Sequence, residues 1–193
     1  MAGIMHTHLA VVTTKKQEAP LVAVVMGSDS DLSIMKGAIE MLIKFEVPYC
    51  AAIMSAHRTP ETVSDFAKDA EANGLKAIIA GAGMSAALPG CIAAHTTVPV
   101  IGVPISAGAY TGDSLLAMAQ MPPGIPVATV AINGAANAAI LAAEIIGTGD
   151  ENVRKKLWQY KDKMKKDVYD KNTTLQEIGY QGYLELMAKN KQR

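Results

Sequence analysis

The residues best suited to chemistry lie in the segment 55–60, Ser-Ala-His-Arg-Thr-Pro, which follows an apolar run. A histidine such as His57 can both give and take a proton near neutral pH. Arg58 offers a planar fork of donors that fits a phosphate group. The Ser55 hydroxyl can donate to phosphate oxygens. These residue types favour binding of a phosphorylated ligand combined with acid–base chemistry.

Local signals place this segment between a strand and a helix. Thr59 is a good N-cap, Pro60 suits the first helical position, and Glu61 complements the helix dipole. In an open parallel sheet, ligands bind beyond the carboxyl ends of the strands, which is where this turn would lie. An ordinary capped turn with a solvated histidine and arginine explains the same residues, so the segment alone leaves both interpretations open.

A second polar segment, Gly-Ser-Asp-Ser-Asp at residues 27–31, follows the apolar run 21–26 and precedes apolar residues at helical spacing. Such a loop offers backbone N–H groups and small hydroxyls to a phosphate monoester at the positive end of a helix. Neither a dinucleotide-binding fingerprint nor a P-loop is present. A serine or aspartate that simply caps the helix is therefore the alternative.

Glycines follow a third short strand, predicted at residues 77–80, in the run Gly81-Ala82-Gly83. Close approach of the backbone to a ligand explains them, and so does tight packing of a helix on the strand. Ligand binding is favoured because this is the third such loop at one edge of the sheet. We expect segments 106–114 and 121–126 to overhang the same crevice.

Apolar runs of strand length alternate with amphipathic segments over most of the chain. This alternation is typical of a three-layer α/β/α sandwich with a parallel sheet. The predicted strands are residues 21–26, 48–54, 77–80, 98–103 and 127–132, and an Ala-rich helix is predicted at 135–146.

The composition changes to a charged tail after residue 149. Apolar residues recur there every three or four positions, and Thr174 with Glu177 predicts a capping box for a second helix. The tail carries the lysines Lys155, Lys156, Lys161, Lys163, Lys165 and Lys166. Interspersed acids favour a solvated helix face over a nucleic-acid surface. We therefore expect a flexible leader (1–20), a catalytic domain (21–149) and a tail (150–193) that docks on the body or on a neighbouring subunit.

Composition and charge limit the classes of function. Eighteen basic and eighteen acidic residues balance, so no global charge attracts nucleic acid or an anionic membrane. The apolar runs are shorter than the roughly 18 to 20 residues of a membrane span. Cys50 and Cys91 lack metal-ligand spacing and suit reduced thiols in the cytoplasm. The leader has no secretory h-region, and its His6 and His8 lack further metal ligands.

Four segments together resemble the N5-carboxyaminoimidazole ribonucleotide mutase family. They are Met-Gly-Ser-Asp-Ser-Asp (26–31), Ser-Ala-His-Arg-Thr-Pro (55–60), Gly-Ala-Gly (81–83) with Leu-Pro-Gly (88–90), and Gln-Met-Pro-Pro-Gly-Ile-Pro (120–126). The resemblance implies a flavodoxin-like fold and a homo-octamer with active sites near subunit boundaries. It also implies conversion of N5-carboxyaminoimidazole ribonucleotide to 4-carboxy-5-aminoimidazole ribonucleotide in purine biosynthesis, without metal, biotin or nucleotide cofactor.

Residue by residue, the resemblance implies acid–base catalysis by His57. It places ligand contacts on Ser28, Ser30, Asp31, Ser55, Arg58, Gly81, Ala82, Gly83 and Leu88. The glycines at 81 and 83 are expected to let backbone amides line a pocket for carbon dioxide. Ala87 stands where many members have His, and Met84-Ser85 replaces the commoner Gly-Ala, which implies altered ligand contacts in that loop rather than lost activity.

Three other functions match parts of the sequence. An aminoimidazole ribonucleotide carboxylase takes up carbon dioxide directly, but that branch typically has Lys after the motif histidine, and Arg58 stands here. A flavodoxin-like flavin carrier or signalling receiver is disfavoured, because aromatic residues make up 5% of the chain and none lies in the first or third loop to stack on a flavin. A lysine-tailed binding module would bind nucleic acid in a salt-sensitive way.

Overall fold

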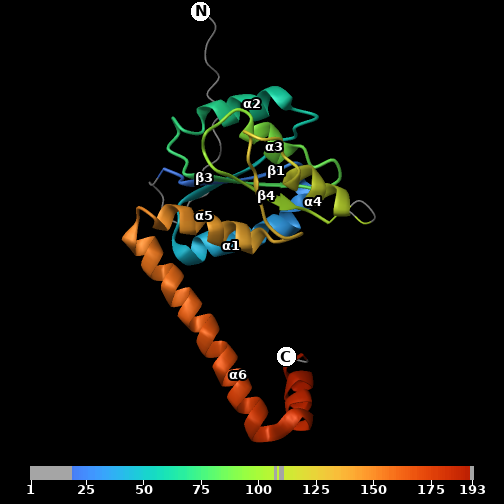
Figure 1. The fold of residues 1–193 in the computed structure, drawn as a ribbon, viewed down its shortest axis with the longest axis vertical. Coiled ribbons are helices and arrows are strands. Elements are labelled where there is room, and N and C mark those ends of the chain that lie inside the picture. The colour runs from blue at the N-terminus through green and yellow to red at the C-terminus, as the bar shows by residue number, and fades with distance from the viewer. Residues whose placement is uncertain (1–18, 107, 109–110, 192–193) are drawn as a thin grey trace, which may run out of the picture. The chain divides into compact units, whose positions relative to one another are not determined.

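The computed structural model describes residues 19–106, 108 and 111–191 (Figure 1). All but the last two residues of the predicted leader, with His6 and His8, lie outside the described residues. The chain divides into two compact units, one that runs through Arg154 and one that comprises Lys155–Arg193. The second unit thus begins at 155, whereas the sequence predicted a tail from 150.

The first unit is built around one parallel sheet. Its strands are β1 (Val22–Met26), β2 (Tyr49–Ile53), β3 (Ala77–Ala82), β4 (Val100–Pro104) and β5 (Ala128–Thr129). They are arranged in the order β2-β1-β3-β4-β5, which is the order of the flavodoxin-like doubly wound fold. β1, β3 and β4 are buried along their whole length, as their unbroken apolar runs indicate. The predicted fold class is confirmed.

Strand register brings the polar segments to one edge of the sheet. Met26 at the end of β1 lies opposite Ile53 of β2 and Gly81 of β3. Gly81 lies opposite Val103 of β4 in turn. The chain therefore leaves these four strands at the same level, and the segments that follow them become neighbours in space.

The fifth strand is shorter than the predicted span of 127–132. Residues 128 and 129 pair with β4, and the chain then turns, because the Gly134 N–H donates to the Ala131 carbonyl at 2.8 Å. This turn brings Asn133 to the same edge as the other strand ends.

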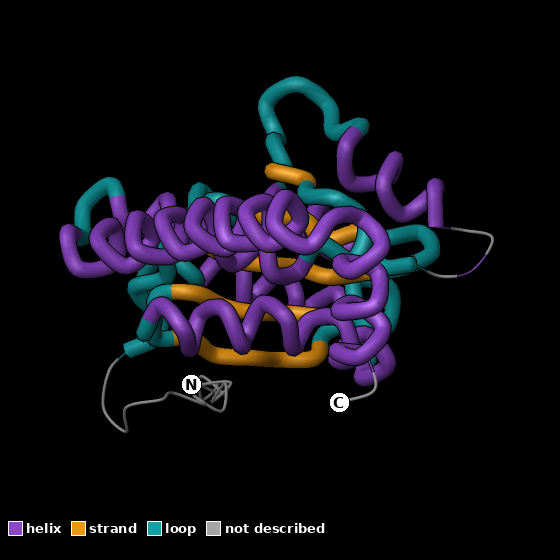
Figure 2. Tube along the Cα trace, turned by 90° about the horizontal axis from the view of Figure 1, so that it is seen from below, coloured by secondary structure: helices purple, strands orange, loops and turns teal. Residues whose placement is uncertain are grey.

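Helices cover both faces of the sheet (Figures 1 and 2). They are α1 (Leu32–Phe45), α2 (Pro60–Asp69), α3 (Leu88–Ala93), α4 (Thr111–Ala119) and α5 (Ala135–Gly147), with a short 3₁₀ helix, η1 (Asp29–Asp31), before α1. α1 packs against α5, and α2 packs against α3. Val63 of α2, Ile92 of α3 and Met118 of α4 share one buried cluster with strand residues, so these three helices cover the face opposite α1 and α5.

Gly81 lies within β3 rather than in the loop after it, because the strand continues to Ala82. A Cβ at this position would collide with Met35 Sδ of α1 and would lie 3.1 Å from Ile105 Cδ1. Glycine is therefore required for close packing of α1 on the sheet. The prediction that the third strand ends before Gly81 is wrong, and the packing alternative accounts for the glycine; its contact with a ligand stays a prediction.

The long helix α6 (Glu151–Lys191) makes up the second unit from Lys155 onward. No new helix begins at Thr174, so the predicted capping box is wrong: the Thr174 hydroxyl donates to the Asp170 carbonyl at 2.9 Å within the helix. The helical backbone is interrupted at Gly179, whose φ of 69° and ψ of 171° suit glycine. Exposed large apolar side chains in α6 include Trp158, Val168, Tyr169, Tyr180 and Leu184.

The two cysteines differ in burial. Cys50 and Cys91 are free thiols. Cys50 is buried in the core, and burial raises the pKa of its thiol to about 11. Cys91 packs against the same core. Within the described ranges, no helix combines the length and apolar character needed to cross a bilayer.

Candidate active site

The polar segments line a cavity of about 720 Å³ at the carboxyl edge of the sheet. We call it the carboxyl-edge cavity. The predicted site residues on its wall are Ser28, Ser30, Asp31, Ser55, His57, Arg58, Ala82, Gly83 and Leu88. Three of the four segments thus meet in one cavity, whereas Gly81 is not on the wall.

Ser28 and Asp31 cap each other in the loop after β1. The Ser28 Oγ accepts from the Ser30 N–H at 3.4 Å, and Asp31 Oδ2 accepts from the Ser28 N–H at 3.1 Å. This capping box fixes the loop at the start of η1, which confirms the capping alternative. Capping and ligand binding are compatible, because Ser30 is exposed and Ser28 is only half-buried.

The Asp31 carboxyl lies where water solvates it poorly. Burial raises the pKa of this carboxyl above its usual value; Asp29 acts in the same direction, while the Ser28 and Gly27 N–H groups and the Arg58 charge oppose it. A carboxyl group that is partly removed from water is stabilised by a hydrogen-bond donor that a ligand supplies. Asp31 is therefore suited to accept hydrogen bonds from ligand hydroxyls.

The turn 55–60 is closed by Thr59. Its hydroxyl accepts from the Ser55 N–H at 3.0 Å and donates to the Ser55 carbonyl at 3.2 Å. Thr59 occupies the N-cap position of α2 as predicted, but its side chain does not cap the helix, because these two bonds hold it. The turn therefore presents His57 and Arg58 on a fixed backbone.

Arg58 joins the ends of β1 and β2. Its Nη2 donates to the Gly27 carbonyl at 2.8 Å, and its Nε donates to Ser55 Oγ at 3.4 Å. These bonds use two of the five N–H donors of a guanidinium group. The charge therefore lies between the Ser28 loop and Ser55, where a phosphate would meet hydroxyl, backbone and guanidinium donors together.

His57 lines the cavity beside Arg58 and is exposed to solvent in the single chain. Its imidazole therefore has access both to a ligand in the cavity and to protons from water. A histidine placed in this way is suited to general acid–base catalysis.

The loop after β3 completes the middle of the wall. Met84 has a φ of 53° and is 59% exposed. This left-handed region is one that glycine adopts freely, whereas another L-residue adopts it at a cost of about 1 to 2 kcal/mol. The conformation explains why glycine suits this position. Ala87 also lies on the wall, so both departures from the family pattern face the cavity.

Sequence reasoning missed Asn133, which reaches the cavity from the end of β5. Its backbone φ is 59°. The available signal was the Asn-Gly pair at 133–134, because asparagine followed by glycine is typical of turns with positive φ. From the predicted segment 106–114, Ser106 lines the cavity, while residues 107, 109 and 110 lie outside the described residues.

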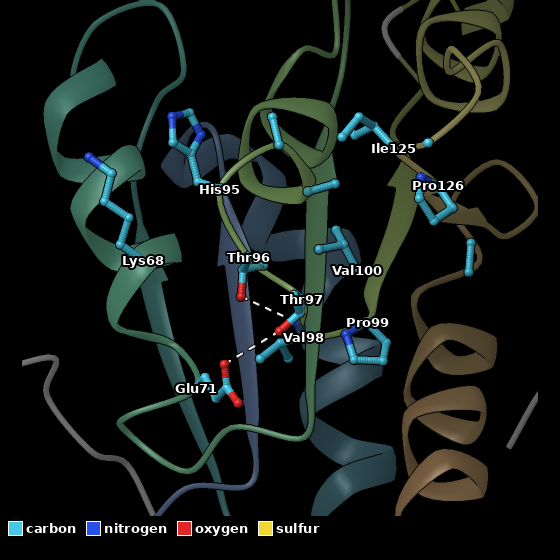
Figure 3. Close-up of a pocket in the computed structure, with 14 residues that line it drawn as sticks. Lys68, Glu71, His95, Thr96, Thr97, Val98, Pro99, Val100, Ile125 and Pro126 are labelled. Carbon is cyan, nitrogen blue, oxygen red and sulfur yellow. Dashed lines mark hydrogen bonds between the residues drawn. The ribbon is translucent and has the colours of Figure 1, made fainter.

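The segment 121–126 does not line this cavity, contrary to the prediction. It runs from the end of α4 to the start of β5, so it lies at the amino edge of the sheet. There Gly124, Ile125 and Pro126 line a second cavity of about 790 Å³ together with residues at the start of β4 (Figure 3).

This second cavity carries fewer groups for chemistry. Lys68 and His95 lie across it from Ile125 and Pro126 (Figure 3). The His95 Nδ1 is 2.9 Å from the Cys91 carbonyl, so its imidazole contacts the end of α3, where a histidine complements the helix dipole. The carboxyl-edge cavity is smaller but brings together hydroxyls, a carboxyl, an imidazole and a guanidinium. We assign the chemistry to it.

Fold and site define a doubly wound α/β protein with a crevice at the carboxyl edge of its sheet that is lined by hydroxyl, carboxyl, imidazole and guanidinium groups. Within the described part of the chain, no three His, Cys, Asp or Glu side chains are grouped to hold a metal ion. The sequence pattern described as AIR carboxylase matches residues 21–167. The chain belongs to this AIR carboxylase family.

Relatives of two kinds are similar to the chain. The N5-carboxyaminoimidazole ribonucleotide mutase of Pyrococcus horikoshii is 53% identical over 90% of this chain and 99% of its own length. The corresponding mutase of Thermotoga maritima is 51% identical over 86% of this chain and 97% of its own length. A Candida glabrata phosphoribosylaminoimidazole carboxylase is 47% identical over 94% of this chain but only 32% of its own length. The crystal structure of Treponema denticola PurE superposes on this chain with a TM-score of 0.75. The matched region is 30% identical in sequence and spans 81% of this chain and 98% of the Treponema denticola chain.

Proposed function

We propose that the protein is an N5-carboxyaminoimidazole ribonucleotide mutase of purine biosynthesis. The observation that carries the proposal is the meeting of His57 with Ser28, Ser55 and Arg58 in one cavity. The similarity to curated mutases over nearly their whole length supports it. The reaction moves a carboxylate from N5 to C4 of the aminoimidazole ring and gives 4-carboxy-5-aminoimidazole ribonucleotide.

Ligand binding is proposed to start from the phosphate. Arg58, Ser55 and Ser28 bind the phosphate oxygens, because guanidinium and hydroxyl groups are its natural donors. Asp31 accepts from the ribose hydroxyls. Ser30, Ala82, Gly83 and Leu88 complete the proposed contacts along the wall.

The proposed mechanism accounts for every bond and proton and uses no cofactor. The bond between N5 and the carboxylate carbon breaks, carbon dioxide is released into the cavity, and N5 gains a proton. C4 then attacks the carbon dioxide, a new carbon–carbon bond forms, and C4 loses its proton. His57 gives the first proton and removes the second, so the enzyme returns to its starting state.

The main rival is direct carboxylation of aminoimidazole ribonucleotide. The Candida glabrata carboxylase is about three times as long as the part that this chain matches, so its activity does not transfer directly. Assay of both substrates decides between the functions. We expect turnover of N5-carboxyaminoimidazole ribonucleotide without added bicarbonate, and turnover only of aminoimidazole ribonucleotide with bicarbonate would contradict the proposal.

We also propose a homo-oligomer, in the form of an octamer, in the cytoplasm. In the single chain His57 and Met84 are exposed, whereas retention of carbon dioxide requires a site closed to water. Exposed apolar side chains along α6 suit an interface between copies of the chain. The free thiols of Cys50 and Cys91 suit the reducing cytoplasm.

Deletion of residues 155–193 tests the role of the second unit in assembly. We expect a smaller assembly, because the deletion removes exposed apolar side chains such as Val168 and Leu184. Light scattering coupled to gel filtration gives the mass of the parent and of the shortened chain. A parent that is monomeric at micromolar concentration, or an unchanged number of chains after the deletion, would reject this assignment.

A further inference from the structure

Asn133 belongs to the wall of the carboxyl-edge cavity, but the proposed function gives it no role. Its φ of 59° lies in the left-handed region, which asparagine tolerates better than most other residues. Its backbone N–H donates to the Pro104 carbonyl at 2.8 Å. The end of β4 therefore fixes the position of Asn133.

One hydrogen bond sets the orientation of the Asn133 carboxamide. The Ser106 backbone N–H donates to Asn133 Oδ1 at 2.9 Å. A backbone N–H can only donate, so the oxygen of the carboxamide faces Ser106 and Nδ2 takes the other side. The bond to Ser106 orients the plane of the carboxamide, and the Nδ2 N–H groups remain as donors for a ligand in the cavity.

Asn133 lies apart from the proposed phosphate site along the sheet edge. Arg58 and Ser28 follow β2 and β1, whereas Asn133 is bonded to residues at the end of β4, with β3 between β1 and β4. Neighbouring strands are about 4.8 Å apart, so the ends of β1 and β4 are separated by about 10 Å. A ligand held by its phosphate near Arg58 must extend across the sheet edge toward Asn133.

We propose that Asn133 Nδ2 donates a hydrogen bond to the carboxylate of the carboxylated aminoimidazole ribonucleotide. The carboxylate lies at the end of this ligand that is remote from the phosphate, and it accepts strongly from an amide N–H. Asn133 therefore distinguishes the carboxylated ribonucleotide from the uncarboxylated one. The assignment rests on the proposed function and adds a residue that selects the ligand.

Asn133→Asp is the sharpest test. The aspartate has the same shape and can still accept from the Ser106 N–H, but it replaces the donor with a negative oxygen. We expect the affinity for 4-carboxy-5-aminoimidazole ribonucleotide to fall about ten- to a hundredfold, because a charge-assisted hydrogen bond is lost. Aminoimidazole ribonucleotide, which has no carboxylate, should bind as it does to the parent. Titration calorimetry measures both.

Two further variants separate binding from structure. Asn133→Gly keeps the positive φ and should show the same selective loss. Asn137→Asp adds the same charge in the first turn of α5, off the cavity wall, and should bind both ribonucleotides as the parent does. Equal loss for both ribonucleotides, or no loss, in Asn133→Asp would overturn the assignment. A parent that binds neither ribonucleotide would overturn the proposed function itself, and this assignment with it.

Discussion

His57→Asn should fold, assemble and bind the ribonucleotide nearly as the parent does, while turnover falls by about 10² to 10⁴. That range is what general acid–base catalysis typically supplies. Asparagine keeps a polar side chain of similar reach but cannot titrate. The geometry supports a selective effect, because His57 is exposed on the cavity wall and the turn that carries it is closed by Thr59 and Ser55. Calorimetry and turnover on the same preparation separate binding from rate.

His95→Asn provides the matched control. This histidine lies in the second cavity, where its Nδ1 contacts the Cys91 carbonyl, so its loss should leave turnover unchanged. Preserved turnover in His57→Asn would reject His57 as the group that gives and removes the two protons. A loss of binding proportionate to the loss of rate would reassign His57 to ligand positioning.

The sheet and the position of the site follow from local signals. Unbroken apolar runs indicate buried parallel strands, and polar residues directly after three of them predict that they meet at one edge. The register of Met26 with Ile53 and Gly81 confirms this meeting. These predictions are correct because they need only the direction of the chain and the spacing of apolar residues. Both can be read from the sequence itself.

The errors have two sources, namely tertiary packing at one glycine and misplaced boundaries of elements elsewhere. Gly81 has the same residue type as a loop glycine, but Met35 and Ile105 make it a packing position. Thr174 and Glu177 match a capping box, but the helix continues and Gly179 interrupts it instead. Segment 121–126 lies at the amino edge because it precedes a strand rather than follows one. Only the Gly81 error depends on residues distant in sequence; the other two depend on where neighbouring elements begin and end.

Arg58→Ala should weaken ribonucleotide binding about ten- to a hundredfold, because it removes a charge-assisted contact worth roughly 1.5 to 3 kcal/mol. The guanidinium also donates hydrogen bonds to the Gly27 carbonyl and Ser55 Oγ, so the substitution removes the contact that joins the ends of β1 and β2. Arg58→Lys keeps the charge but loses the fork, and it should fall between the parent and the alanine variant. Calorimetry with the ribonucleotide measures the affinities.

Inorganic phosphate identifies the group that Arg58 binds. In the parent it should compete with the ribonucleotide, and in Arg58→Ala the competition should weaken in step with the loss of ribonucleotide affinity, because both ligands use the same donors. Arg154→Ala is the matched control, since Arg154 pairs with Glu151 at the start of α6 and lies off the cavity wall. An alanine variant at 58 that binds the ribonucleotide as tightly as the parent would show that Arg58 is not the phosphate ligand, and Ser28 and Ser55 would then carry that role.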